Sequence, residues 1–454
     1  MHLCTLTCTL LLSAPLQELR TDEHLLGTIP EDLSLVGEPL VDPDGNTWPV
    51  EHDVIYGPLG NRVAYVAEKE GRRHPVIDGE VHDAYHYTGV PHFDDSGQTV
   101  ILRVGNRTKK TRETWWVLVN DELVGKADWI GLPAISADGS HIAYWTQPGA
   151  KIERSGAYDR SDQVLVVARR KGKGWKLDKG GKWDDALSLT PPLLSQDGLR
   201  VSTIAMDQGK WFVLQRAKKE KKLGKGEYSI SELAADLQGK SVAFTAPSDA
   251  GAATPFGAPP GFSMPGMQNV VRWGKATLGE DFDNAVAPVV GPKGKHVAYK
   301  AVDGARMGIV LDDEDELDAG YDFVHTPVFS PDGKRLAYAV TEGGELHDFY
   351  RGSALGDSMI QGGESFVLSH ATRGKRSPER GATWLEVRHL TFDPKGEHLA
   401  YAARSEEGWT VVLDEEPGPF YDDVGAPRFS ADGAHLGHGS RSGRELWWRV
   451  RVVD

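Results

Sequence analysis

The chain has 454 residues, of which 39% are hydrophobic and 26% are charged, as is usual for a soluble globular protein. Its formal net charge of −15 argues against nucleic acid as a partner, because phosphate binding relies on a basic surface. The only cysteines are Cys4 and Cys8, so the rest of the chain holds no disulfide, thiolate zinc site or cysteine nucleophile.

The chain begins with a short apolar run. Residues 3–12 read LCTLTCTLLL and are followed by Ser13-Ala14-Pro15, as in the core of a secretory signal. A poorly structured tail is the alternative, since no Lys or Arg precedes the run. The run is too short to cross a bilayer, and nothing later approaches the ~20 apolar residues that a transmembrane segment needs. We assign residues 1–20 to a signal or disordered segment and favour periplasmic or extracellular export over a cytoplasmic location.

Nine segments between residues 57 and 438 share one pattern, for example SADGSHIAY (136–144), SPDGKRLAY (330–338) and DPKGEHLAY (393–401). Each has a turn ending in Gly, then a variable residue, a polar residue, an aliphatic residue and a small residue, and usually an aromatic residue. Glycine supplies the positive φ of a tight hairpin without steric cost. The next residues alternate large and small, which predicts a strand covered on both faces. A column of small residues would let neighbouring sheets approach closely.

The turn glycines are 37 to 63 residues apart, and the short spacings match the ~40–45 residues of a four-stranded propeller blade. We therefore predict an all-β fold: a single β-propeller of about eight or nine four-stranded blades over residues 46–454, after a lead-in at 21–45. The chain stops before the last blade has its fourth strand, so residues 46–52 (NTWPVEH) are predicted to supply it and close the ring. An unclosed last blade is the alternative.

SPDGKRLAY and its siblings resemble the WD-repeat-like propeller repeats of TolB-type periplasmic proteins. They also resemble the propellers that precede the catalytic domain of prolyl-oligopeptidase-type peptidases. The resemblance covers roughly residues 53–454 and implies the fold, but it implies no function. The Gly-His and Trp-Asp marks of true WD repeats are absent, and no room is left for a hydrolase domain. A stand-alone relic of a peptidase propeller is a weaker interpretation.

Three long segments, 147–162, 247–267 and 342–364, each follow the second strand of a unit and precede its third. Loops at equivalent blade positions emerge on one face, so this face is predicted to bind a partner, although tolerated surface insertions would look the same. The candidate binding residues on these loops are Tyr158, Phe256, Phe262, Met264, Phe349 and Tyr350.

Charge is also patterned along the chain. Residues 169–182 and 218–225 are rich in Lys and Arg, whereas 312–318 is acidic. Such runs usually face water, but they could also dock a partner protein electrostatically. The candidate rim residues are Arg169, Arg170, Lys171, Lys219, Lys221 and Lys222 on the basic arc, and Asp312, Asp313 and Asp315 on the acidic arc.

No group of residues in the sequence forms a recognisable catalytic or metal-binding pattern. The histidines two residues after the turn glycines (His141, His296, His398 and His435) share their column with Arg and Ser, which indicates a polar strand start. His82, His86 and His92 form a better metal candidate, but the orientation of their strands is unknown. There is no G-x-S-x-G elbow and no phosphate loop. We predict no catalytic residue, metal or cofactor, and a non-enzymatic scaffold that binds a protein or another macromolecule. The alternative is a propeller hydrolase or lyase with its site at the channel mouth.

Overall fold

The computed structural model describes residues 18–453, except for 37–39, 42–46, 49–53, 110–111, 151–161, 189, 249–267, 313–314, 349–357 and 374–377. The predicted signal therefore falls almost wholly outside the described residues, and export stays a prediction. No helix in the described part of the chain has the length and apolarity needed to cross a membrane.

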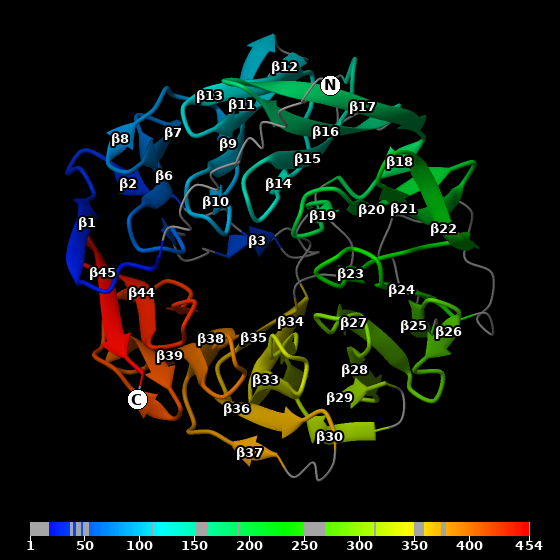
Figure 1. Cartoon of the computed structure of the whole chain (residues 1–454), viewed down its shortest axis with the longest axis vertical. Coiled ribbons are helices and arrows are strands. Elements are labelled where there is room, and N and C mark those ends of the chain that lie inside the picture. The colour runs from blue at the N-terminus through cyan, green and yellow to red at the C-terminus, as the bar shows by residue number, and fades with distance from the viewer. Residues whose placement is uncertain are drawn as a thin grey trace, which may run out of the picture.

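The described strands form nine successive antiparallel units arranged as a ring around a central opening, which defines a β-propeller (Figure 1). Seven units are sheets of four or five strands. The other two units share one eight-stranded sheet, in which a single parallel pair, Asn269 with Asn284, joins them. In each unit an inner strand leads through the glycine turn into a second strand, and the second strand pairs with a third.

The strands of the first five units are β2 (Ser34–Leu35), β5 (Ile55–Tyr56), β6 (Val63–Lys69), β7 (Arg72–Ile77) and β8 (Glu80–Val81); β9 (Tyr87–Thr88), β10 (His92–Phe93), β11 (Val100–Lys109), β12 (Arg112–Val119) and β13 (Glu122–Ala127); β14 (Ala134–Ile135), β15 (His141–Thr146), β16 (Gln163–Lys171) and β17 (Gly174–Trp183); β18 (Asp185–Ala186), β19 (Leu193–Leu194), β20 (Val201–Asp207), β21 (Lys210–Arg216) and β22 (Glu220–Glu227); and β23 (Leu233–Ala235), β24 (Val242–Pro247), β25 (Asn269–Trp273) and β26 (Ala276–Leu278).

The strands of the last four units are β27 (Asn284–Val290), β28 (Val297–Asp303), β29 (Arg306–Leu311) and β30 (Asp315–Tyr321); β31 (Phe323–Val324), β32 (Val328–Phe329), β33 (Arg335–Glu342), β36 (Glu364–Ala371) and β37 (Glu379–Arg380); β38 (Glu386–Phe392), β39 (Leu399–Ser405), β40 (Gly408–Leu413) and β41 (Glu416–Pro417); and β42 (Asp423–Val424), β43 (Arg428–Phe429), β44 (His435–Ser442), β45 (Glu445–Val452) and β1 (His24–Thr28). Two separate hairpins are β3 (Leu40–Val41) with β4 (Thr47–Trp48), and β34 (Glu345–Asp348) with β35 (Ser358–Gln361).

An N-terminal strand closes the ring, as predicted, but the predicted segment 46–52 was wrong. β1 pairs with β45 from His24 opposite Trp448 to Thr28 opposite Glu445, whereas β4 pairs with β3. The Arg444 side chain fixes this junction, since Nε donates to the Ile29 carbonyl at 2.8 Å and Nη2 to the Leu33 carbonyl at 2.8 Å. The predicted lead-in 21–45 therefore supplies strands to two units, β1 to the last and β2 to the first.

The repeated turn is held by side chains as well as by glycine. In the turn that starts at Ser195, Oγ donates to Asp197 Oδ1 at 2.6 Å and accepts the Arg200 N–H at 2.9 Å. This hydrogen bond is the main cause of the lowered pKa of Asp197. Where the first turn residue is an acid, it takes both roles, as when Asp393 Oδ1 accepts the His398 N–H at 2.9 Å. The Ser-Pro-Asp-Gly pattern thus encodes a turn that satisfies its own backbone donors.

An aspartate at the end of the third strand ties this strand to the start of the second. Asp312 accepts the Val297 N–H at 2.9 Å through Oδ1 and contacts His296 Nδ1 at 2.6 Å through Oδ2. Asp78 does the same with Val63 and Arg62, and Asp414 with Leu399 and His398. The column that we interpreted as a polar strand start therefore holds the blade together.

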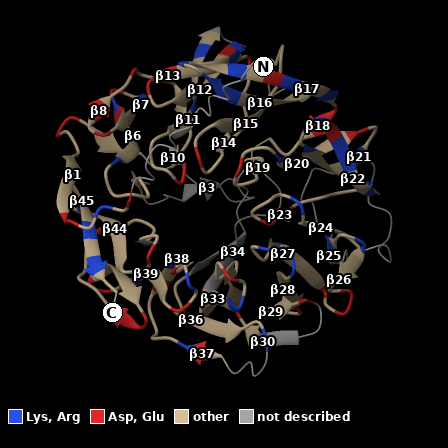
Figure 2. Cartoon of the chain, viewed as in Figure 1, with Lys and Arg blue, Asp and Glu red and all other residues tan. Residues whose placement is uncertain are grey.

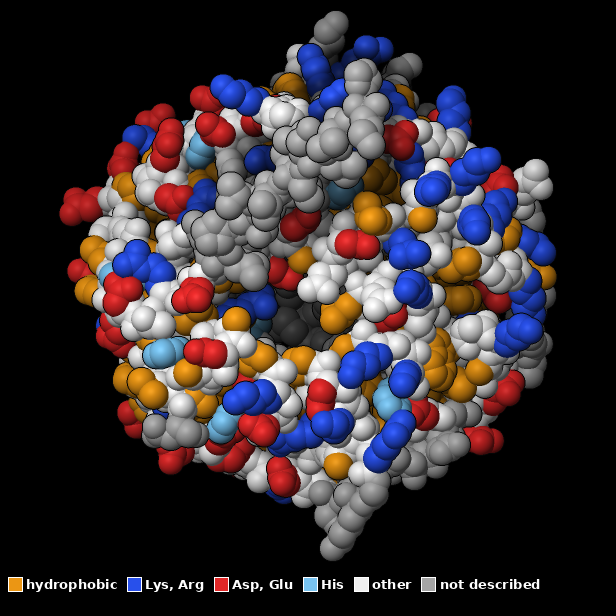
Figure 3. Space-filling model, viewed as in Figure 1, with side chains coloured by type: hydrophobic (Ala, Val, Ile, Leu, Met, Phe, Trp, Pro, Cys, Tyr) orange, Lys and Arg blue, Asp and Glu red, His pale blue; other side chains and the backbone are white. Residues whose placement is uncertain are grey.

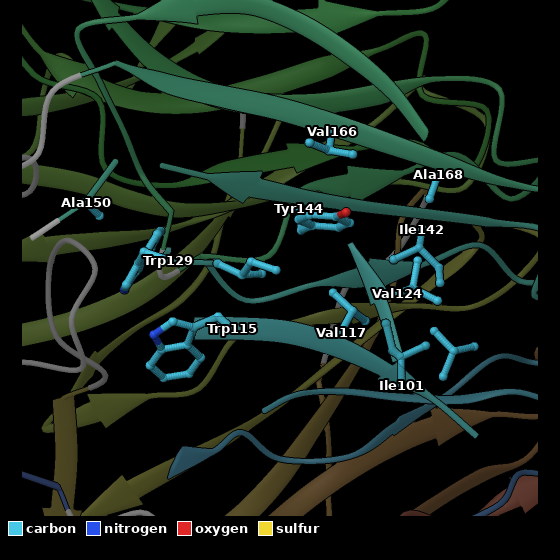
Figure 4. Close-up of a cluster of buried hydrophobic side chains, with 12 residues drawn as sticks. Ile101, Trp115, Val117, Val124, Trp129, Ile142, Tyr144, Ala150, Val166 and Ala168 are labelled. Carbon is cyan, nitrogen blue, oxygen red and sulfur yellow. The ribbon is translucent and has the colours of Figure 1, made fainter. Parts of the chain in front are cut away.

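Nine clusters of buried hydrophobic side chains occur in the described residues, one between each pair of neighbouring units around the ring. In Figure 4, Ile101 and Val117 of the second unit lie beside Ile142, Tyr144 and Val166 of the third. The predicted small column lies at these interfaces and is fully buried at Ala64, Ala143, Ala243, Ala298, Ala337 and Ala400. At its last position a Cβ on Gly437 would lie 2.2 Å from the Trp448 ring. Close approach of the sheets therefore requires small residues here.

We predict that deleting residues 1–29 lowers the melting temperature strongly and promotes association. The deletion removes β1 and the buried Ile29 side chain and leaves the edge of β45 unpaired. The matched control is deletion of residues 1–17, which should melt like the full chain. If 46–52 closed the ring instead, both deletions would melt alike in a thermal scan.

His438 occupies the aromatic position of the last repeat, and neither of its ring nitrogens has a hydrogen-bond partner in the described part of the chain. Burial, with Arg449 nearby, lowers its pKa to about 3. The unfolded chain would bind a proton at the ordinary pKa of about 6.5, so stability is fully present above that pH and is lost as pH falls below it.

We predict that His438→Phe removes this loss. The difference in unfolding free energy between the variant and the parent should grow by up to about 1.4 kcal/mol per pH unit below pH 6.5. Urea unfolding at pH 8, 6 and 5 measures it. A difference that does not change with pH would show that His438 is not the titrating group.

Candidate functional site

The two basic segments form the third-to-outer-strand hairpins of neighbouring units, β16–β17 and β21–β22. Arg216 joins them, because its Nη2 lies 2.7 Å from Asp178 Oδ2 on β17 and its Nη1 lies 3.7 Å from Glu220 Oε1. Glu220 Oε2 also accepts the Gly181 N–H at 3.0 Å. The structure thus places the basic segments 169–182 and 218–225 side by side. We call the pair of hairpins, residues 163–183 and 210–227, the basic rim (Figure 2).

Most cations of the basic rim are exposed. In the described part of the chain, no carboxylate forms an ion pair with Arg169, Lys171, Lys173, Lys176, Lys179, Lys218, Lys219 or Lys221. Arg170 lies over the Trp175 ring at 5.3 Å. Lys222 is different, since it pairs with Asp207 and also lies 4.3 Å from the centre of the Phe212 ring. The rim is therefore a local concentration of positive charge on an acidic protein.

The acidic clusters are largely used within the fold. Asp312 and Asp414 make the strand ties described above, and Glu416 pairs with Arg451 at 2.6 Å. Glu415 accepts hydrogen bonds from the Tyr401 hydroxyl and the Ala382 N–H. Asp313 lies outside the described residues, and Asp315 belongs to β30 without a described side chain.

A groove of about 750 Å3 opens between the outer strand of the fourth unit and the fifth unit. Leu223, Gly224, Lys225 and Glu227 of β22 form one wall. The glycine turn at 236–242 and β25 to β26 form the other wall, and Lys293 and Gly294 of the sixth unit close one end. We call this cavity the β22–β25 groove. Its volume lies within the ~300–1,000 Å3 of pockets that hold ligands.

The groove exists because the interface between the fourth and fifth units is incompletely filled. Its cluster has five fully buried members, Leu187, Ile204, Trp211, Val213 and Ile230, and all of them precede the fifth unit. Val242 and Phe244, the large residues of the fifth repeat, are only partly buried. The same aromatic column is almost fully buried at Tyr65, Tyr144, Tyr299, Tyr338 and Tyr401. Gly224 of β22 also lines the groove and provides no side chain to fill the space, since a Cβ there would have no neighbouring atom within 4 Å.

Side-chain hydrogen bonds fix the walls of the groove. Trp273 Nε1 donates to Ser241 Oγ at 2.9 Å, and the Ser241 N–H donates to Asp236 Oδ1 at 3.1 Å. Arg272 donates to Thr277 Oγ1 and lies 3.9 Å from Glu227. Five cations and two acids line the groove: Lys225, Lys240, Arg272, Lys275 and Lys293 against Glu227 and Asp236.

A second cavity of about 450 Å3 lies where the inner strands of the second to sixth units meet the central opening. Its lining is mostly apolar and includes Ile135, Leu193, Leu233 and Val289. Burial raises the pKa of Asp94 there, but Asp94 accepts hydrogen bonds from the Ser96 hydroxyl and the Thr99 N–H of its own turn. Asp94 thus has a structural role.

The histidines predicted as a metal candidate are not brought together. His86 Nδ1 lies 3.0 Å from Asn106 Oδ1, His92 is on the inner strand β10, and the His82 carbonyl binds His74. Across the described ranges no group of three or more His, Cys, Asp or Glu side chains is arranged to hold a metal ion.

The three long loops do connect second to third strands, in the third, fifth and seventh units. Their candidate binding residues lie outside the described residues: Tyr158, Phe256, Phe262, Met264, Phe349 and Tyr350. The β22–β25 groove was missed. Gly224, which lines the groove without a side chain, is a trace of it in the sequence, but a glycine alone does not predict a groove.

No protein-family model and no curated protein match the chain. Similar solved structures include a eukaryotic initiation factor (10% identity, 84% of this chain and 90% of that chain covered, TM-score 0.45). They also include the Dos1 propeller (10%, 95% and 94%, 0.42) and TolB from Acinetobacter baumannii (12%, 77% and 81%, 0.32). At these values the similarities carry no argument about function, and the propeller assignment rests on the strand topology of the chain itself.

We predict that Phe244→Ala destabilises the protein much less than Tyr299→Ala. Tyr299 is fully buried, so its truncation should cost about 3–5 kcal/mol, whereas the half-buried Phe244 should cost about 1–2 kcal/mol. Denaturant unfolding measures both values. Equal losses would mean that the interface at Phe244 is filled in solution.

Proposed function

We propose that this propeller is a non-enzymatic scaffold that docks a partner protein through its basic rim. The observation that carries the proposal is the set of eight exposed rim cations that pair with no carboxylate in the described part of a chain whose net charge is −15. Some exposed charges elsewhere on the ring are neutralised by neighbours, as at Glu416 with Arg451. Complementary charge steers encounter and sets specificity, so such a rim favours an acidic partner surface.

The rigidity of the rim supports the same proposal. The Arg216 side chain is only 9% exposed and lies 2.7 Å from the exposed carboxylate of Asp178, so a largely buried guanidinium group joins the two hairpins. A preorganised surface loses less conformational entropy on binding than mobile hairpins do. We also propose that the chain is related to TolB-type propellers, which its repeat pattern supports. We propose further that it is exported, which the apolar run at residues 3–12 supports. Mass measurement of the N-terminus of the secreted protein would test the export.

We predict that Lys171→Glu/Lys173→Glu abolishes capture of the partner by the immobilised full chain. The matched control, Arg373→Glu/Lys395→Glu, makes the same charge change at exposed positions of the seventh and eighth units and should capture normally. Capture by the parent should weaken as salt rises from 50 to 500 mM, because exposed charges are screened. Equal losses in the two variants would reject the rim as the docking surface.

The predicted loop face is a competing location for docking. Replacing residues 247–267 with a short Gly-Ser linker should leave rim-dependent capture intact, provided that the protein is first shown to be folded. Loss of capture with the loop replacement, but not with the rim variant, would move the site to the loop face.

A further inference from the structure

We propose that the β22–β25 groove binds a short acidic peptide segment that inserts an apolar side chain between the fourth and fifth units. This inference rests on the proposed scaffold function and names the chemistry of the partner segment. In Figure 3, Lys and Arg side chains lie on both sides of apolar surface over the part of the ring where Figure 1 places β23 to β27. The lining residues supply both halves of the recognition.

The apolar half is the unfilled blade interface. Phe244 and Val242 remain partly exposed at a position where five other repeats bury a tyrosine, and Trp273 adds a second aromatic wall. An inserted Leu or Phe side chain would complete the packing that the chain's own residues leave incomplete. A fully buried side chain of this size contributes about 1.5–3 kcal/mol.

The ionic half is the set of lysines that line the same groove. In the described part of the chain, no carboxylate pairs with Lys275 or Lys293, and Lys240 Nζ contacts the neutral amide of Gln238 at 2.7 Å. These three ammonium groups are exposed and line one cavity. Carboxylates of a bound segment would therefore meet cations that need no release from existing ion pairs.

A peptide fits better than a nucleic acid strand. The groove is bounded by the buried acids Glu227 and Asp236, and the whole chain carries −15, so a polyphosphate backbone would leave the basic lining within a few nucleotides. The side-chain hydrogen bonds of Trp273, Ser241 and Arg272 hold the walls in place before binding. A fixed groove of limited length suits a short extended segment.

The test uses the full chain and a fluorescein-labelled octapeptide with six Asp and Glu residues around a central Leu-Phe pair, followed by anisotropy. Lys293→Glu should weaken binding at least about fivefold, by loss of attraction and added repulsion. The matched control is Lys395→Glu, since Lys395 holds the same Pro-Lys-Gly turn position two units later in the ring and does not line the groove. That variant should bind within twofold of the parent.

Two further probes examine the chemistry. A peptide with Asn and Gln in place of the acids, and the acidic peptide with Gly-Gly in place of Leu-Phe, should each bind more than fivefold more weakly. Equal binding of the acidic and neutral peptides, or equal effects of Lys293→Glu and Lys395→Glu, would overturn the proposal. Displacement of the peptide by a short oligothymidylate or by inorganic phosphate at lower concentrations would overturn it in favour of a phosphate ligand.

The outcome is separable from that of the rim proposal. Lys171→Glu/Lys173→Glu lies on the third unit and should leave binding of the octapeptide nearly unchanged. If that variant loses partner capture while the octapeptide fails to bind the parent, only the groove proposal fails. If the octapeptide binds as described and Lys171→Glu/Lys173→Glu leaves partner capture unchanged, only the rim proposal fails.

Discussion

Close packing of neighbouring blades is the constraint on which the rest of this structure depends. Most second strands carry a small residue between two large ones, and the small residue lets the next sheet approach. Ala298 and Ala337 are completely buried in this way, and Gly437 replaces alanine where the Trp448 ring leaves no space for a Cβ. Because every blade contacts only its two neighbours, the ring is a chain of separate interfaces. A single weak interface can therefore open a groove without disturbing the others.

The polar groups follow from the same arrangement. The inner strands and turns must satisfy their backbone donors close to the central opening, and Ser195 with Asp197 shows how one turn does so locally. Asp312 and Asp414 tie the third strand to the second, which uses much of the acidic charge inside the fold. Within the basic rim, Lys182, Arg216 and Lys222 form ion pairs, but the eight exposed cations named above pair with no carboxylate in the described part of the chain. The fold thus uses much of its negative charge in internal contacts and leaves these cations unpaired. The result is a locally positive surface on an acidic protein.

The sequence predicted those features that each repeat encodes for itself. The turn chemistry of SADG and SPDG, the buried small column and the loops between second and third strands all depend on residues a few positions apart. The closing strand could not be placed in the same way, because β1 meets β45 across more than 400 residues and any short extended segment near the N-terminus could have served. HLLGT at 24–28 carries no turn or spacing signal that distinguishes it from 46–52.

For a related reason, the sequence predicted the charged residues of the candidate site but not how they are arranged. The lysines at 218–225 were evident in the sequence, but their contact with β17 through Arg216 and Glu220 depends on how two blades pack. The β22–β25 groove was not predicted, since it depends on how incompletely the fourth and fifth units pack around Val242 and Phe244. A repeat pattern shows which residues a blade has, and only the packed ring shows which spaces remain empty.

Hydrogen exchange of the chain with and without its captured partner tests the central claim most directly, that docking occurs on the arc formed by the third to fifth units. The account predicts slowed exchange at 169–176, 218–227 and 269–277 in the complex. Slowed exchange confined to the last two units, 386–452, or absent from the arc altogether, would contradict it.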